Sequence, residues 1–168
     1  VYERLLIDLP VNGQTRKTVV TSGKLGIVEA IDRVNGEWLW GKETVPQNVV
    51  SAIDPKTGAK TINPAVIPQI GQTTFNCPAD PGGRAWQATS YSPKTRMLYM
   101  LTAEYCSNTV LNPLDQGQVY TGGGLATYNR VPVPNGDGKI GQVRAVNLDN
   151  RTDVWMYRQY APITTSTL

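Results

Sequence analysis

Short apolar runs separated by turn residues recur along the chain, and no window carries the sustained apolar spacing of an amphipathic helix. The clearest unit spans residues 21–40. Residues 27–31 are mostly apolar and β-branched, Asn35-Gly36 favours a tight turn with positive φ, and residues 38–40 resume as a strand. The pattern therefore predicts a β-hairpin around this turn in an all-β protein.

A spaced pattern within this hairpin occurs twice in the chain. A small residue, an acid or amide, a turn and a tryptophan stand at the same offsets in residues 30–40 and 145–155. The alanine lets a neighbouring sheet approach, and the acid or amide can bond backbone amides in the turn. The tryptophan is a flat anchor between adjacent sheets, so we expect Trp40 and Trp155 to be largely buried. Residues 52–58 form a partial copy that lacks the tryptophan.

The rest of the chain alternates in the same way between β-branched runs and turns. One segment differs, because about residues 108–138 are poor in apolar side chains and rich in glycine, asparagine and proline. We expect a long surface insertion there, with the triple glycine at residues 122–124 as a flexible loop rather than a dinucleotide site. Further strands are expected in residues 1–9, 16–22, 87–102 and 140–145.

Composition excludes several kinds of chemistry. The 168 residues are enough to bury a substantial core, and the net charge of +3 comes from dispersed lysines and arginines, which indicates a solvated surface rather than a nucleic-acid groove. No stretch approaches the ~18 apolar residues of a membrane span. Histidine is absent, which excludes serine–histidine catalysis and histidine-ligated metal sites. Two cysteines alone cannot form a structural zinc site.

Together these motifs resemble the methanol and ethanol dehydrogenases that use pyrroloquinoline quinone (PQQ), whose eight-bladed β-propellers carry tryptophan-docking repeats. The resemblance covers nearly the whole chain in the family's order and approximate spacing. It implies an all-β arc of about three blades, with residues 1–168 as one internal or C-terminal-side propeller segment that continues into further blades at both ends. The segments that carry it are residues 17–26, 30–40, 77–86, 91–93, 145–155 and 161–165, with Cys106.

The resemblance implies a function for a larger parent protein. The family oxidises a primary alcohol to an aldehyde in the periplasm, using PQQ with a calcium or lanthanide ion and a cytochrome c-type electron acceptor. Its catalytic base, an aspartate, and its metal ligands fall upstream of Val1, so the resemblance assigns no catalytic residue and no metal ligand to this chain. The expected partners are the remainder of the propeller, a small alcohol and the cytochrome, and the segment alone is expected to be inactive.

The resemblance also marks residues beside the cofactor. Lys24 lies in a glycine-flanked turn where the family has a cation that bonds the quinone oxygens. Ala85 stands where many members have an asparagine, so that amide contact is not expected, and Arg84 and Trp86 are the candidates for lining the site. Thr164 falls at a further family contact.

The family also pairs cysteines at the positions of Cys77 and Cys106, the only two in the chain. Simpler interpretations remain open at each position. Lys24 can be a solvated turn lysine, Trp86 can be a packed residue after a Gly-Gly turn, and the cysteines can be two buried thiols.

Two other functions also remain open. One is a non-catalytic propeller of the same repeat that acts as a scaffold or assembly factor, and the other is an independent binding module. Lys24 in its glycine-flanked turn and the cysteine pair favour the enzyme, since a scaffold needs neither. The expected continuation of both ends argues against an independent module.

Overall fold

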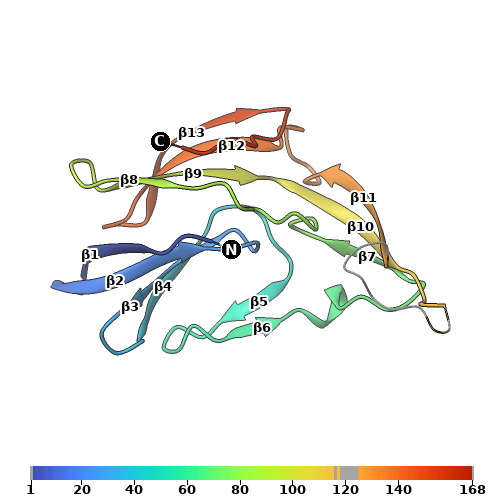
Figure 1. Ribbon diagram of the computed structural model, residues 1–168, viewed down its shortest axis with the longest axis horizontal. Helices are drawn as coiled ribbons and strands as arrows, with labels where there is room; N and C mark the ends of the chain where they lie inside the picture. Colours follow the sequence, from blue (N-terminus) through green and yellow to red (C-terminus); the bar gives the residue numbers. More distant parts are fainter. Residues whose placement is uncertain (1, 116, 118–124, 168) are drawn as a thin grey trace.

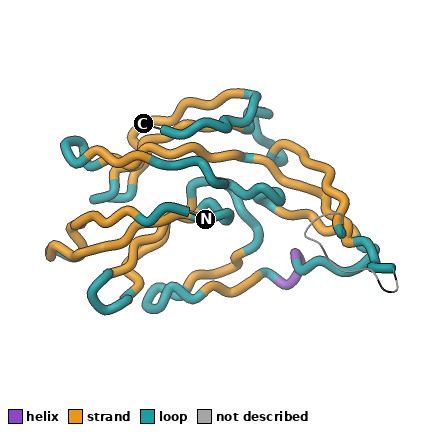
Figure 2. The backbone as a smooth tube through the Cα atoms, viewed as in Figure 1, coloured by secondary structure: helices purple, strands orange, loops and turns teal. Residues whose placement is uncertain are grey.

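The computed structural model describes residues 2–115, 117 and 125–167, which form an all-β structure with a short 3-10 helix. The described strands form antiparallel sheets that lie side by side, with the sheet of the N-terminal strands next to the sheet of the C-terminal strands (Figures 1 and 2). Within these residues no helix has the length and apolar character needed to cross a membrane.

Two four-stranded sheets contain most of the strand residues. The N-terminal sheet has the order β1-β2-β3-β4, formed by Leu5–Val11, Gln14–Ser22, Ile27–Asp32 and Trp38–Glu43. The C-terminal sheet has the order β13-β12-β9-β8, formed by Thr152–Gln159, Gly141–Asn147, Met97–Ala103 and Ser90–Ser92.

Two smaller sheets complete the described fold. A three-stranded sheet has the order β11-β10-β7, formed by Ala126–Pro132, Tyr105–Leu111 and Thr73–Asn76. The strands β5 at Val50–Ile53 and β6 at Lys60–Ile62 pair with each other, and the 3-10 helix η1 follows at Pro64–Val66.

The two copies of the spaced sequence pattern adopt the same pairing. Ala30 in β3 lies opposite Trp40 in β4, and Ala145 in β12 lies opposite Trp155 in β13. The strand register shifts directly after each of these alanines. The predicted repeat is therefore a structural repeat, with a small residue facing a tryptophan in both sheets.

The turns of the two copies are also built alike. Asp32 Oδ1 accepts a backbone N–H from two residues further on at 2.7 Å, and Asn147 Oδ1 does the same at 2.9 Å. The left-handed position is filled by Gly36 at φ 80° in the first copy and by Arg151 at φ 64° in the second. The acid or amide thus holds each turn, as its place in the pattern indicates.

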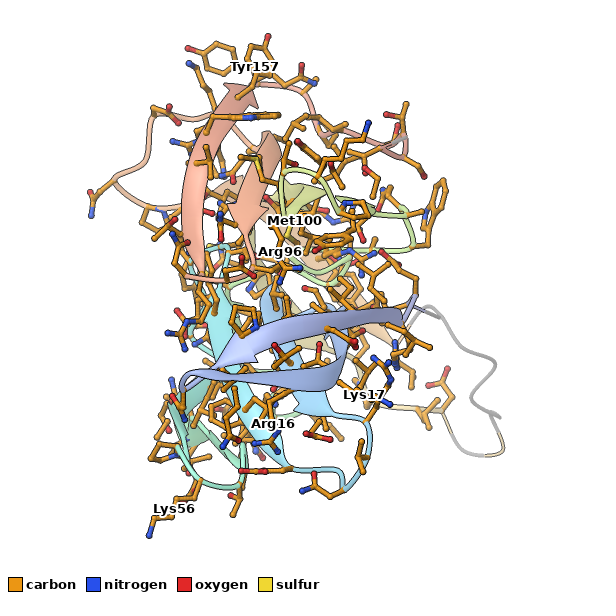
Figure 3. All side chains as sticks on the ribbon, turned by 90° about the vertical axis from the view of Figure 1, so that its left-hand side faces the viewer. Arg16, Lys17, Lys56, Arg96, Met100 and Tyr157 are labelled. Atoms are coloured by element: carbon orange, nitrogen blue, oxygen red, sulfur yellow. A yellow bond between two sulfur atoms is a disulfide. The ribbon has the colours of Figure 1, made fainter. Side chains whose placement is uncertain are left out.

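The core lies between the N-terminal and C-terminal sheets. Trp40 is only 5% exposed and belongs to this core, which confirms its expected burial. Met100 lies on the side of the C-terminal sheet that meets the N-terminal sheet (Figure 3). The buried members of the cluster are Ile7, Leu9, Val20, Val28, Ala30, Trp40, Leu98, Met100, Val146 and Leu148.

Trp155 is 45% exposed, so its expected burial is wrong. Side chains alternate along β9, with Leu98 and Met100 in the core and Tyr99 on the opposite face of the sheet. The Tyr99 ring lies 6.1 Å from the Trp155 ring, which places the indole on that opposite face. Among the described strands β13 is an edge strand that pairs with β12 alone, so no neighbouring sheet covers Trp155 as the C-terminal sheet covers Trp40.

The segment expected as a surface insertion, about residues 108–138, is not all loop. β10 and β11 pair with each other from Tyr105 opposite Pro132 to Leu111 opposite Ala126, and β10 also pairs with β7. Most of β11 is exposed, so polar side chains are compatible with strand there and the composition is misleading. The expected glycine loop at residues 122–124 lies outside the described residues.

A disulfide joins Cys77 to Cys106 across 29 residues, which confirms the expected pair. Cys106 lies in β10, and Cys77 directly follows β7 in the same sheet. The bond therefore fixes the start of the segment after Cys77 beside Tyr105. Both of these segments reach the cavity described next.

Candidate functional site

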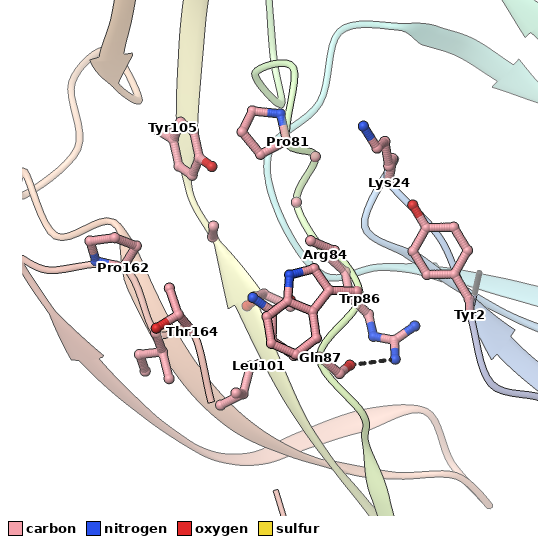
Figure 4. A pocket seen from close by; sticks show the side chains of 16 residues that line it. Tyr2, Lys24, Pro81, Arg84, Trp86, Gln87, Leu101, Tyr105, Pro162 and Thr164 are labelled. Carbon is pink, nitrogen blue, oxygen red and sulfur yellow. Dashed lines mark hydrogen bonds between the residues drawn. The ribbon is translucent and has the colours of Figure 1, made fainter. Parts of the chain in front are cut away.

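A cavity of about 480 Å³ opens between the N-terminal and C-terminal halves of the chain (Figure 4). Lys24, Arg84, Trp86 and Thr164, the four residues marked in the sequence, all lie in its lining. The remaining lining residues are Tyr2, Pro81, Gly82, Gly83, Ala85, Gln87, Leu101, Thr102, Ala103, Tyr105, Pro162 and Ile163. The fold thus brings together candidates that are up to 140 residues apart, Lys24 and Thr164 being the most distant pair.

Lys24 sits in the tight turn between β2 and β3. Gly26 at φ 69° donates its N–H to the carbonyl of Gly23 at 2.9 Å, which closes this turn. The Lys24 side chain is exposed, and Nζ donates to the backbone carbonyl of Asp80 at 2.9 Å. An ammonium has three donors, so this single bond leaves donors that can face a ligand in the cavity.

The Lys24 turn packs directly on the backbone of the next cavity segment. Gly83 N–H donates to the Lys24 carbonyl at 2.8 Å. A Cβ at Gly82, where φ is 93°, would come within 2.8 Å of Lys24 backbone and side-chain atoms. Glycine is required there both for the backbone angle and for the close approach.

Arg84 lines the cavity, but its guanidinium is directed into the protein. Nη1 donates to the carbonyl of Ser22 at 2.5 Å, and Nη2 donates to the carbonyl of Gln87 at 2.9 Å and to both carboxylate oxygens of Glu3. The side chain is only 1% exposed, and the guanidinium carbon also lies 5.7 Å from the centre of the Tyr2 ring. These contacts indicate that Arg84 holds three segments of the cavity wall together.

Glu3 completes this buried cluster. Its carboxylate accepts from Arg84 and also from the backbone N–H of Thr89 at 2.8 Å and the Thr89 hydroxyl at 2.5 Å. Burial raises the pKa of Glu3, but the hydrogen bonds from Arg84 and Thr89 together outweigh burial and lower it to about 2. Glu3 is therefore ionised at neutral pH and balances the buried charge of Arg84.

Trp86 and Thr164 present different chemistry to the cavity. The Trp86 side chain is 69% exposed and offers a flat indole face at the opening (Figure 4). Thr164 is also exposed and lies in the C-terminal segment after β13. This segment is tied to the rest of the wall at Thr167, whose hydroxyl donates to the carbonyl of Tyr99 at 3.1 Å, and at Ser166, whose hydroxyl accepts the N–H of Ala88 at 3.1 Å.

Tyr2 and Tyr105 line the cavity as well and were not marked by the sequence. Burial raises the pKa of Tyr105, so its hydroxyl stays protonated well beyond neutral pH. Its position directly before Cys106 is the one available signal, because the disulfide fixes that residue beside the cavity. Tyr2 carries no such signal, and only long-range folding brings it to this place.

The charges of the lining point to an anionic ligand. Among the described residues that line the cavity, Lys24 and Arg84 are the charged ones, and because Glu3 balances Arg84, Lys24 supplies the positive charge that a ligand meets. Within the described parts of the chain, no three or more histidine, cysteine, aspartate or glutamate side chains gather in a way that could hold a metal ion. The site can therefore stack a planar group on Trp86 and bond its negative oxygens from Lys24.

No protein-family model matches the chain. It is 39% identical over 101 residues to the dehydrogenase subunit of a quinone alcohol dehydrogenase from Komagataeibacter europaeus, covering 60% of this chain and 14% of that protein. It is 29% identical over 154 residues to subunit 1 of a cytochrome c methanol dehydrogenase from Methylobacterium organophilum, covering 86% of this chain and 24% of that protein. The chain thus spans at most about a quarter of the length of these relatives.

Solved structures show the same relationship at the level of the fold. A europium-containing methanol dehydrogenase superposes with a TM-score of 0.84 at 24% identity, over 97% of this chain and 28% of the other. A quinohemoprotein alcohol dehydrogenase from Comamonas testosteroni gives 0.80 at 22% identity, over 98% of this chain and 25% of the other. These matches confirm the expected all-β propeller-segment fold. The chain is a homologue of the quinone-dependent alcohol and methanol dehydrogenases and corresponds to a fragment of them.

Proposed function

We propose that this chain is a segment of a PQQ-dependent alcohol dehydrogenase that oxidises a primary alcohol to an aldehyde, and that its cavity is part of the cofactor site. The convergence of Lys24, Trp86 and Thr164 on one cavity carries the proposal. These residues come from the β2–β3 turn, the segment before β8 and the segment after β13. These segments are far apart in the sequence, and the fold brings all three to one cavity. Such convergence is typical of a binding site.

The lining fits PQQ in size, charge and shape. PQQ is a planar, polyanionic quinone, and a cavity of about 480 Å³ lies within the usual range for small-molecule sites. The Lys24 ammonium is positive, Arg84 is balanced by Glu3, and no carboxylate is among the described lining residues, so a polyanion meets no like charge there. The exposed indole of Trp86 supplies a flat surface for a planar ring system.

The residues of this chain would act by binding and by charge stabilisation. PQQ, when bound, supplies the chemistry of hydride acceptance from the alcohol. Lys24 keeps donors beyond its bond to the Asp80 carbonyl, and a positioned ammonium stabilises negative charge that grows on an oxygen beside it. Arg84 and Glu3 would act behind the wall, where Arg84 holds the backbone at Ser22, before Lys24, and at Gln87, directly after Trp86.

The remaining parts of the mechanism would come from the rest of the propeller. We assign the aspartate base and the ligands of a calcium or lanthanide ion to that part, and a cytochrome c-type protein as the electron acceptor in the periplasm. The names of the relatives support this assignment, since one is a cytochrome c methanol dehydrogenase and another structure contains europium. A cavity that presents the Lys24 ammonium favours a ligand-binding enzyme over a scaffold, since a scaffold needs no such site.

A titration of the full-length protein with PQQ tests the proposal. Apoprotein with calcium or lanthanum present is titrated with PQQ while tryptophan fluorescence is followed, and alcohol-dependent reduction of an artificial electron acceptor is measured in parallel. We expect saturable quenching, with aldehyde formed in step with the reduced acceptor. Absence of PQQ binding would overturn the site assignment, and binding without alcohol oxidation would favour the non-catalytic propeller.

A further inference from the structure

A second cavity of about 310 Å³ adjoins the candidate cofactor cavity. The two share Tyr105 and Pro162, so these side chains form the boundary between them. Tyr105 and Pro162 lie on the same side of the opening in Figure 4, across from Lys24. The second cavity is lined by Tyr105, Arg130, Val131, Pro132, Gly138, Ile140, Tyr160 and Pro162.

The wall of the second cavity is held by the backbone. Tyr105 at the start of β10 lies opposite Pro132 at the end of β11. Ile140, directly before β12, donates its N–H to the carbonyl of Gln159 at 3.0 Å and accepts from Glu104 N–H at 2.8 Å. The cavity is therefore built where three strand ends meet, and it does not depend on one loop.

Its chemistry differs from that of the first cavity. Among the described residues of the lining, Arg130 is the only charged one, and its Nε and Nη2 donate to the two oxygens of Asp80 at 2.8 and 2.7 Å. That bidentate pair balances the arginine charge, so no uncompensated charge faces the cavity. The other surfaces are aliphatic, proline or tyrosine. Such a lining selects a neutral, largely apolar group.

Asp80 links the two cavities. Its carboxylate holds Arg130 in the second lining, and its backbone carbonyl accepts from Lys24 Nζ in the first. Asp80 is therefore the one residue between Arg130 in the second lining and Lys24, which faces the proposed cofactor. This shared contact shows that the second cavity is structurally connected to the candidate site.

We propose that the second cavity receives the carbon skeleton of the alcohol substrate, so that the enzyme prefers primary alcohols with an extended apolar chain or ring. The inference rests on the proposed function. The volume of this cavity is many times the ~30 Å³ that one water molecule occupies in the liquid. A one- or two-carbon alcohol would therefore leave most of the cavity filled with water. A longer chain displaces that water from apolar walls, which is the favourable exchange.

The test fills the cavity and compares alcohols of different length. Val131→Trp in the full-length, PQQ-loaded protein places an indole in the cavity, and kcat/KM is measured for 1-hexanol, benzyl alcohol and ethanol. A pocket that loses room for single methylene groups discriminates by about tenfold or more, so the hexanol-to-ethanol ratio should fall by at least about tenfold. The matched control is Asn129→Trp, which lies on the same face of β11 but does not line the cavity and should leave the ratio within twofold.

A second variant covers the case in which Val131→Trp does not fold. Tyr160, whose side chain is 71% exposed, lines only the second cavity, and Tyr160→Ala should raise KM for 1-hexanol with little change in kcat. Bound PQQ, measured by absorbance, shows for each variant that the first cavity is intact. Unchanged selectivity in both variants with normal PQQ content and turnover would overturn the inference and leave the proposed function standing. Absence of PQQ-dependent alcohol oxidation in the unmodified protein would overturn both.

Discussion

Arg84 donates to both carboxylate oxygens of Glu3, a residue 81 positions away in the sequence, in an ion pair buried behind the cavity wall. The guanidinium side chain is 1% exposed and the carboxylate side chain 27% exposed. Arg84 also bonds the carbonyls of Ser22 and Gln87, which lie close in sequence to Lys24 and Trp86. The pair therefore connects the segment before β1 to the two segments that carry Lys24 and Trp86.

Loss of Glu3 should destabilise the protein strongly. Glu3→Gln leaves the guanidinium of Arg84 buried without its counter-charge, a change that typically costs about 3–5 kcal/mol in the free energy of unfolding. Urea unfolding of the full-length protein measures it. Glu37→Gln is the matched control, because Glu37 also pairs with an arginine but is 49% exposed, and it should change the free energy of unfolding far less than Glu3→Gln does. Equal, small effects for both variants would show that the buried pair is not important.

The same pair predicts an acid-dependent loss of stability. The folded-state pKa of Glu3 is about 2, below its ordinary value of 4.5, so its contribution is fully present above about pH 4.5 and is lost as the pH falls towards 2. The difference in Tm between the unmodified protein and Glu3→Gln should therefore shrink between these two pH values. A difference that stays constant down to pH 2 would contradict the assignment.

Substitution of Trp40 should affect stability, whereas substitution of Trp86 should affect cofactor binding. Trp40 is 5% exposed in the core, and Trp40→Ala should cost about 3–5 kcal/mol. Trp86 is 69% exposed at the cavity, so Trp86→Ala should change stability by less than about 1 kcal/mol but weaken PQQ binding by removing the stacking surface. Unfolding and PQQ titrations on both variants measure this. Normal PQQ affinity in Trp86→Ala would remove that residue from the site.

Reduction of the disulfide should loosen the cavity. The Cys77–Cys106 bond closes a loop with a separation of 29 residues, for which the chain-entropy model gives about 3–4 kcal/mol of stabilisation. It also fixes Tyr105, which lines both cavities. We expect the double variant Cys77→Ser/Cys106→Ser to lose about this stability and to bind PQQ more weakly. Intact mass before and after alkylation verifies the pair, and two freely alkylated thiols in the untreated protein would contradict it.

Local signals in the sequence predicted the elements that depend on local chemistry. The hairpin at Asn35-Gly36 and its repeat follow from turn residues and β-branched runs, and both appear in the structure. The same local motif could not distinguish Trp40 from Trp155, because burial depends on whether another sheet packs on that face. The strand β11 was missed since its side chains are mostly exposed and polar.

The cavity itself required information that the sequence pattern does not hold. The resemblance to a family marked Lys24, Arg84, Trp86 and Thr164, and the structure brings all four to one lining. The resemblance does not indicate that Arg84 faces inward. Glu3, which holds its guanidinium, is far away in the sequence, and the backbone carbonyl of Ser22 leaves no signal in the sequence. Tyr105 and the second cavity likewise arise where separate strand ends meet.

The most direct measurement is the turnover of Lys24 variants in the full-length, PQQ-loaded protein. Loss of one preorganised donor beside developing charge lowers kcat by about 10²–10³, so Lys24→Ala should lose this much and Lys24→Arg should retain more. Lys56→Ala is the control, since Lys56 is exposed in the turn between β5 and β6 (Figure 3), does not line the cavity and should leave kcat unchanged. Full turnover by Lys24→Ala with normal PQQ content would contradict the account that this wall faces the cofactor.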